Sequence, residues 1–166
     1  FVVIGPKGDP ANIRAATQAI DALGRIASVK APFVSRGDDS GTHKKERALW
    51  QADGLAPEGF GAWYKAVGAG MGASLNTAAG FGAYILADRA SWLNFGNKGD
   101  LALLFSGDPV RFNQYAYLPV DAGRHPHVNA NASRTLEVWL TSPTAETLIN
   151  GYKIAGEALF VFNAKP

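Results

Sequence analysis

Two glycine-bearing turns in this sequence carry residue types that can bind an anion. The first spans residues 36–42 and the second spans residues 68–73, and each follows a strand-like segment and precedes a helical one. The first N–H groups of a helix have no intrahelical acceptor, and the helix dipole adds partial positive charge there. Glycine lets the main chain come close to a bound anion. The two turns therefore predict a pair of oxyanion cradles in one domain.

The first turn has the larger set of hydrogen-bond donors. Arg36 supplies a permanent positive charge on a planar fork of N–H groups. Ser40 and Thr42 supply hydroxyl groups, and the N–H groups of Gly41 and Thr42 are expected to point outward from the start of a helix. A fully deprotonated tetrahedral dianion needs donors only. These residues therefore suit such a ligand, although the same helix start also occurs in proteins without one.

Two acidic residues lie within the first turn. Asp38 and Asp39 look unsuited to an anion site, and we assign them to capping the helix and to holding Arg36 in place. Asp38, Ser40 and His43 also have the residue types of a hydrolase triad. They crowd on one turn, whereas a catalytic serine sits on a strained elbow and takes its base from elsewhere in the fold. We expect a binding protein and not an enzyme.

The second turn allows a rival interpretation. Gly68, Gly70 and Ala73 fit the short fingerprint of a dinucleotide-binding turn, and Asp88 follows near the position of the ribose-binding acid. The segment before the turn, residues 63–67, is mixed in polarity and not typical of a fully buried parallel strand. Close packing of a helix on a strand explains the glycines better, and we expect no cofactor.

Composition excludes several classes of protein. The 166 residues contain no cysteine, 47% are hydrophobic, and the formal net charge is only +2, so neither a disulfide framework nor a long disordered tail is expected. Residues 43–47 form the one dense basic group, which is too short for a nucleic-acid surface and is expected to be a solvated helix face. His125 and His127 lack a nearby carboxylate, so no metal site is expected. No apolar run has the length of a membrane span.

The elements alternate between strands and helices, which indicates an α/β domain with a largely parallel sheet. A helical stripe between residues 13 and 27 is interrupted near Thr17, and two later helices are separated by residues 141–143. The strand-like segments are residues 1–6, 32–35, 62–67, 84–87, 101–105, 114–120 and 159–162. Because residues 1–6 read as a core strand with nothing before them, we expect further residues upstream, including an export signal, outside this chain.

Residues 31–46, APFVSRGDDSGTHKKE, resemble the hallmark of tungstate ABC-transporter substrate-binding proteins. Residues 70–76, GMGASLN, match the second anion cradle of that family. The likeness continues at residues 1–11, 83–89, 107–113, 125–129 and 139–143. It therefore covers nearly the whole chain. A Thr/Ser-rich anion loop that the family carries near its mature N-terminus is not found in this sequence.

The resemblance implies a type II periplasmic-binding-protein fold, in which two lobes close on an anion. Residues 1–117 would form the second α/β lobe, and residues 118–166 would supply the C-terminal helical part of an incomplete first lobe. The implied ligand-binding residues are Arg36, Ser40, Gly41, Thr42, Gly72, Ala73 and Ser74.

The implied function is capture of a tetrahedral oxyanion outside the cytoplasm for an ABC importer. Tungstate is the first expected ligand and molybdate the second, and the expected partner is the ABC permease, with no nucleic acid involved. The expected location is periplasmic or extracellular, peripheral to the membrane through the permease or through an anchor outside this chain. The alternative is an oxyanion-sensing effector domain of a transcription regulator.

Overall fold

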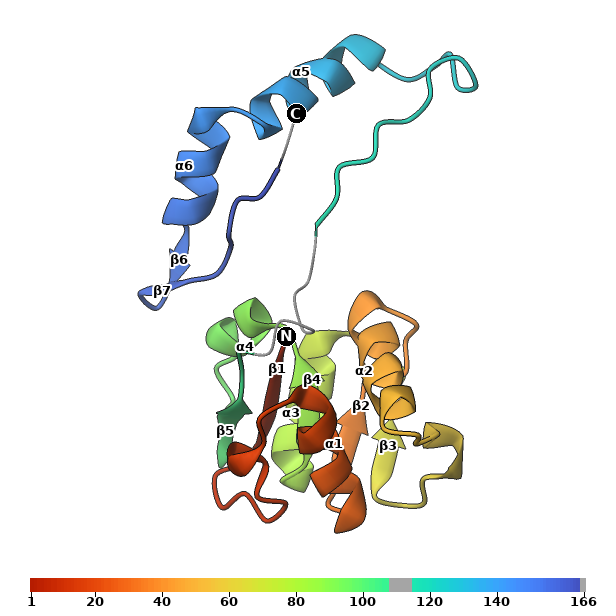
Figure 1. Ribbon diagram of the computed structural model, residues 1–166, viewed down its shortest axis with the longest axis vertical. Helices are drawn as coiled ribbons and strands as arrows, with labels where there is room; N and C mark the ends of the chain where they lie inside the picture. Colours follow the sequence, from red (N-terminus) through yellow and green to blue (C-terminus); the bar gives the residue numbers. More distant parts are fainter. Residues whose placement is uncertain (108–114, 165–166) are drawn as a thin grey trace. The chain divides into compact units, whose positions relative to one another are not determined.

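Five strands form one sheet in the computed structural model, which describes residues 1–107 and 115–164. The chain divides into two compact units, Phe1–Asn113 and Gln114–Pro166, and the sheet belongs to the first (Figure 1). Its order is β3-β2-β4-β1-β5. The strands are β1 (Val2–Pro6), β2 (Phe33–Ser35), β3 (Tyr64–Ala66), β4 (Tyr84–Ala87) and β5 (Leu101–Phe105).

The sheet is mixed, with one strand running against its neighbours. β2 pairs in parallel with both β3 and β4, whereas β1 pairs antiparallel with β4 and with β5. The predicted strands of this unit and the largely parallel character of the sheet are confirmed. Because β2, β3 and β4 run the same way, their carboxyl ends lie along one edge of the sheet. That edge is where the two glycine turns begin.

Helices cover both faces of the sheet and enclose two separate cores (Figure 1). α1 (Ala19–Ser28) and α2 (Gly41–Ala52) bury Leu23, Ile26, Leu49 and Trp50 against one face. α3 (Met71–Phe81) and α4 (Arg89–Asn94) bury Leu75, Ala78 and Trp92 against the other. Alternate residues of β1, β2 and β4 face opposite cores, as the pleat requires. The helices that follow the two turns, α2 and α3, therefore lie on opposite sides of the sheet.

The predicted break in the first helix is confirmed. A short 3-10 helix, η1 (Ile13–Ala15), precedes α1, and a second, η2 (Pro57–Gly59), precedes β3. Asp9 lies outside η1, whose N-cap is Asn12, but its carboxylate accepts hydrogen bonds from the N–H of Ile13 at 3.0 Å and of Arg14 at 2.9 Å. The Tyr84 hydroxyl donates to the same carboxylate at 2.9 Å, which ties this loop to β4.

Gly5 in β1 lies directly against the ring of Tyr84. A Cβ atom at this position would stand 2.4 Å from Tyr84 Cδ1 and 2.9 Å from Leu104 Cδ1. We expect Gly5→Ala to lower the free energy of unfolding by about 1–3 kcal/mol, because overpacking forces neighbouring side chains aside. Urea denaturation measures this loss. Gly8→Ala is the matched control, since a Cβ at Gly8 meets nothing within 4 Å, and an equal loss in both variants would contradict the packing argument.

The second unit contains two helices and a small hairpin. α5 (Ala130–Leu140) and α6 (Pro143–Gly151) confirm the two predicted helices, which are capped by the side chains of Asn129 and Ser142. The strand predicted at residues 159–162 is wrong, since the pairing occurs earlier, between β6 (Lys153–Ile154) and β7 (Glu157–Ala158). Ala155 and Gly156, both at positive φ, form the turn that sets this register.

Few residues of the second unit are buried. Among its described residues Ala145 alone is buried, while Leu118 is 82% exposed and Val161 is 84% exposed. Residues 115–120, predicted as extended, pair with no strand, and residues 108–114 lie outside the described part of the chain. In the described ranges no helix is both long and apolar enough to span a bilayer.

Candidate oxyanion-binding site

The two glycine turns are joined by main-chain hydrogen bonds at the edge of the sheet. Val67 N donates to Ser35 O at 3.0 Å, which extends the β2–β3 ladder, and Ala69 N donates to Arg36 O at 3.1 Å. Gly37 takes a φ of 60°, and a Cβ there would stand 2.9 Å from the Cβ of Ala66. Only glycine allows so close an approach at that backbone conformation. The starts of the two turns are therefore side by side.

The first turn ends in a helix start with unused donors. Ser40 is the N-cap of α2, where its Oγ accepts from His43 N at 3.3 Å and its carbonyl accepts from Lys44 N at 2.8 Å. The N–H groups of Gly41 and Thr42 donate to no described residue, as expected for the first positions of a helix. Thr42 is 7% exposed, so its donors lie in a sheltered position.

Arg36 is held by Asp38, as the sequence predicted. Asp38 Oδ2 accepts from Arg36 Nε at 3.1 Å and from Nη2 at 2.5 Å, while Oδ1 accepts from Ser40 N at 3.2 Å. The hydroxyl of Ser40 and the guanidinium of Arg36 lower the pKa of Asp38 to about 2, so this carboxyl is ionised near neutral pH. Arg36 Nη1 donates to no described residue. The guanidinium is thus fixed on one side and open on the other.

The helix-capping role assigned to the two aspartates is wrong. The N-cap position is filled by Ser40, whose hydroxyl reaches the third N–H of the helix. Asp39 instead adopts a φ of 58°, donates its N–H to His43 Nδ1 at 3.0 Å, and pairs its exposed carboxylate with Lys44 at 3.3 Å. Both bonds hold the shape of the turn without entering the set of free donors.

The second turn offers main-chain donors only. Gly70 is the N-cap of α3 and has no side chain, and the N–H groups of Gly72 and Ala73 donate to no described residue. Ser74 is fully buried, its N–H donates to Gly70 O, and its Oγ contacts the carbonyls of Ala69 and Gly70, each at 3.1 Å. These bonds occupy both polar hydrogens of Ser74, so this residue stabilises the turn and offers no free donor.

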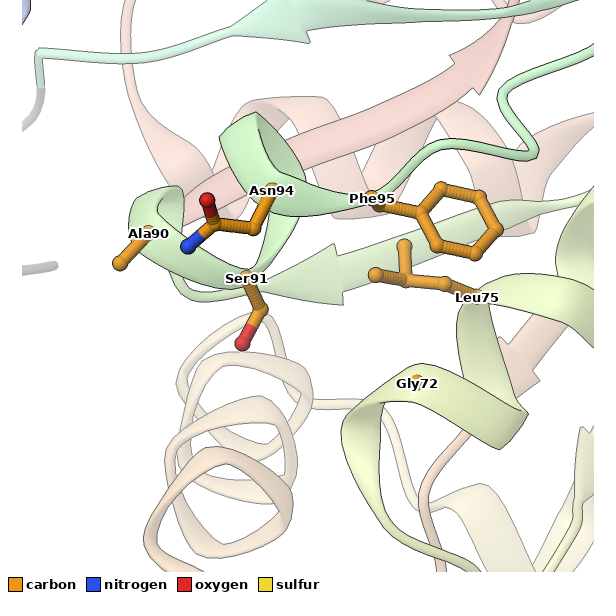
Figure 2. Close-up of a pocket in the computed structure, with 6 residues that line it drawn as sticks. All are labelled: Gly72, Leu75, Ala90, Ser91, Asn94 and Phe95. Carbon is orange, nitrogen blue, oxygen red and sulfur yellow. The ribbon is translucent and has the colours of Figure 1, made fainter. Parts of the chain in front are cut away.

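Gly72 also borders an open hollow between α3 and α4. The hollow has a volume of about 380 Å³, and Figure 2 shows Leu75, Ser91, Asn94 and Phe95 around it. Its lining carries no charged side chain, and Ser91 and Asn94 are its only side chains with polar atoms. A doubly charged ligand would find no countercharge there. The free donors beside Arg36 are the better candidate site.

The described geometry does not support the dinucleotide-binding, hydrolase or metal-binding interpretations. β3 is an edge strand with exposed residues, which explains the mixed polarity of its sequence, and Asp88 caps α4 by accepting from Ser91 N at 2.7 Å. His43 accepts a main-chain hydrogen bond through Nδ1, and the Ser40 hydroxyl accepts one from His43 N, so the two side chains form no relay. In the described part of the chain no three potential metal ligands lie together.

The structure adds a buried acid that the sequence interpretation missed. Glu46 was expected on a solvated helix face, but it is 2% exposed and accepts from the Tyr64 hydroxyl at 2.7 Å and from Trp50 Nε1 at 3.2 Å. Burial raises its pKa to about 7, although the hydrogen bonds from Tyr64 and Trp50 and the nearby Ser35 hydroxyl oppose the shift. The signal was its spacing, because Glu46 lies four residues from both Thr42 and Trp50, on the face of α2 that turns inward.

We expect Glu46→Gln to change how stability depends on pH. Because the pKa is raised from 4.5 in the unfolded chain to about 7 in the folded one, the native carboxyl holds a proton that the unfolded one has lost. Wild-type stability therefore falls as pH rises between these values, by about 2 kcal/mol between roughly pH 5.5 and pH 8.5. Urea denaturation at both pH values measures the change. In Glu46→Gln the free energy of unfolding should lack this dependence on pH. An equal fall with pH in wild type and variant would contradict the prediction.

One family model, the PBP superfamily domain, matches residues 1–148. The chain belongs to the PBP superfamily. The family resemblance and the fold class inferred from the sequence are thereby confirmed. The chain is similar to the solved structure of the tungstate-binding protein TupA from Desulfovibrio alaskensis, with a TM-score of 0.86 and 39% identity over 99% of this chain and 67% of that one. The tungstate ABC transporter structure from Geobacter sulfurreducens has a TM-score of 0.77 and 39% identity, over 91% of this chain and 63% of that one.

Two curated PBP superfamily relatives match almost the whole chain. A Haloferax volcanii protein, provisionally named an ABC transporter anion-binding protein, is 41% identical over 99% of this chain and 49% of its own length. The tungstate-binding protein TupA of Peptoclostridium acidaminophilum is 39% identical over 99% of this chain and 58% of its own length. The chain thus spans about half the length of these relatives.

Proposed function

We propose that this chain is the greater part of an extracytoplasmic substrate-binding protein that captures a tetrahedral dianion for an ABC importer. Tungstate is the preferred ligand and molybdate the second. The observation that carries the proposal is the pair of joined turns, in which two helix starts with free N–H groups flank a guanidinium held open on one side. The names of the relatives, two of which are tungstate-binding proteins, support the choice of ligand.

In this proposal the donors come from both turns. Arg36, Gly41 and Thr42 bind the anion from the first turn, and the N–H groups of Gly72 and Ala73 bind it from the second. Ser40 and Ser74 belong to the same turns but act by shaping them, because their hydroxyls are already engaged within the protein. Within the two described turns the Ser40 and His43 side chains form no relay, and in this proposal the protein binds its ligand and releases it unchanged.

The division of the chain supports a two-lobed arrangement. We propose that residues 1–117 form one lobe and that residues 118–166 complete a second lobe whose remainder lies outside this chain. Half the length of the relatives is unmatched, and large apolar residues such as Leu118, Val138 and Trp139 are exposed in the second unit. Such residues need a covering partner in a stable lobe. The remaining donors to the anion would then come from that other lobe.

The location and the partner follow from the importer role. The full-length protein would be periplasmic or extracellular, and its loaded form would dock on an ABC permease. The relatives named as an anion-binding protein, a tungstate-binding protein and a tungstate ABC transporter support this proposal.

Calorimetry on the full-length protein with tungstate, molybdate, sulfate and phosphate tests the proposed function. Tungstate is expected to bind most tightly, molybdate comparably or more weakly, and sulfate and phosphate hardly at all. Hydrogen phosphate needs an acceptor for its proton, and both oxygens of Asp38 already accept hydrogen bonds. Tight phosphate binding, or no binding of any of the four anions, would overturn the proposal.

A further inference from the structure

Glu46 is a buried charged residue that the proposed capture of an anion does not yet use. It sits one helical turn beyond Thr42 on the inward face of α2, and the two side chains are 2% and 7% exposed. Residues four apart on a helix are neighbours on one face. Glu46 is therefore one turn along from the start of the helix that carries the free donors, on the same inward face.

A hydrogen bond that Glu46 accepts from β3 ties that helix to the sheet. Tyr64 on β3 donates its hydroxyl to Glu46 Oε1 at 2.7 Å, and Trp50 on α2 donates to the same oxygen at 3.2 Å. Ser35, which immediately precedes Arg36 at the end of β2, has a fully buried Oγ without an aligned hydrogen-bond partner, yet it lies close enough to lower the pKa of Glu46. The carboxyl group thus links α2 with β3 and lies near the end of β2, the two strands from which the turns emerge.

We propose that Glu46 is a positioning residue for the oxyanion site and that it takes up a proton when the dianion binds. The inference rests on the proposed function. With Glu46 ionised, a buried negative charge lies one helical turn from the start of α2, where the dianion is proposed to bind, and like charges repel strongly where water is excluded. Protonation removes that charge and leaves the hydrogen bond from Tyr64 in place. Anion binding and proton binding at Glu46 then favour each other, as linkage requires.

Few other charged groups act on Glu46. Arg47, on the same helix, attracts the ionised form, but it is half exposed and paired with Glu58. Tyr64 is held neutral, since burial and the nearby Glu46 raise its pKa far above the neutral range. His43 stands at the start of α2, where its Nδ1 accepts a hydrogen bond from Asp39 N.

The test compares tungstate affinity at about pH 6 and pH 8.5 in the full-length protein and in Glu46→Gln. Glutamine keeps the oxygen that accepts from Tyr64 and Trp50, so the variant retains the links to the sheet. Wild-type affinity is expected to fall about tenfold over this range. The variant should change less than about twofold, and His43→Asn, whose side-chain oxygen can replace Nδ1 as an acceptor, should keep the wild-type dependence.

The outcomes separate this inference from the proposed function. If tungstate binds at neither pH, the proposed function fails and the role of Glu46 fails with it. If tungstate binds with the same pH dependence in wild type and Glu46→Gln, only the role of Glu46 is wrong. A carbon-13 titration of the Glu46 carboxyl in the wild-type protein gives a second measure. Its pKa should rise when tungstate is added, and an unchanged value would overturn the inference without any variant.

Discussion

Replacing Arg36 by alanine is expected to weaken tungstate binding by roughly a hundredfold or more, because a sheltered dianion would lose its nearest formal countercharge. The remaining partners would be N–H dipoles and one hydroxyl, and Asp38 would face the anion without its guanidinium. Calorimetry on the full-length protein measures the loss. Thermal unfolding checks that the variant is folded, which is expected since the Arg36 side chain retains some solvent exposure and lies outside both cores.

Arg36→Lys is the matched control for this prediction. Lysine keeps the charge but replaces the planar fork with a single ammonium group, which cannot bond Asp38 and the anion in the same geometry. An affinity between those of wild type and Arg36→Ala is expected. Equal affinity in wild type and Arg36→Ala would show that the anion binds elsewhere.

Gly37→Ala is expected to damage both the fold and the site. At a φ of 60° an alanine is strained, and its Cβ would press on Ala66 Cβ at 2.9 Å and on Gly68 N at 3.3 Å. Together these terms should lower the free energy of unfolding by about 3 kcal/mol. Because the clash lies where the two turns meet, it should push them apart and remove one donor from the anion. The loss of one donor, roughly 1.4 kcal/mol, should weaken tungstate binding at least tenfold.

Gly68→Ala separates strain from crowding. Gly68 has nearly the same backbone conformation, with a φ of 63°, but a Cβ there meets nothing within 4 Å. Only the conformational cost applies, so a loss of about 1 kcal/mol is expected. Urea denaturation and calorimetry on both variants make the comparison. Equal losses in stability and affinity would contradict the view that close contact between the turns holds the site together.

The sequence was most informative where one local rule decides the structure. The strands at residues 84–87 and 101–105 were predictable because buried apolar runs are bounded by turns, and the start of α2 was predictable because Ser40 precedes a glycine and a helical pattern. The hairpin at residues 153–158 was missed because its strands are two residues long and polar or exposed, so their pairing follows from the turn at Ala155 and Gly156. The strand was predicted at residues 159–162 instead, because these residues are more apolar.

Within the candidate site, residue types were easier to predict than their hydrogen bonds. The pairing of Arg36 with Asp38 followed from adjacency and charge. The engagement of Ser74 did not, because a serine in the first turn of a helix can face either the ligand or its own backbone. Glu46 was hidden by its neighbours Lys44, Lys45 and Arg47, whose charge suggests solvent, while the decisive partner, Tyr64, comes from a strand that is distant in sequence.

Because β1 runs against its two neighbours, its first residues lie beside the last residues of β4 and β5. Val2, where the chain first joins the sheet, pairs with Ala87 at the carboxyl end of β4, and Val3 pairs with Phe105 at the carboxyl end of β5. The start of β1 and the end of β5 therefore lie on the same edge of the sheet as the two turns.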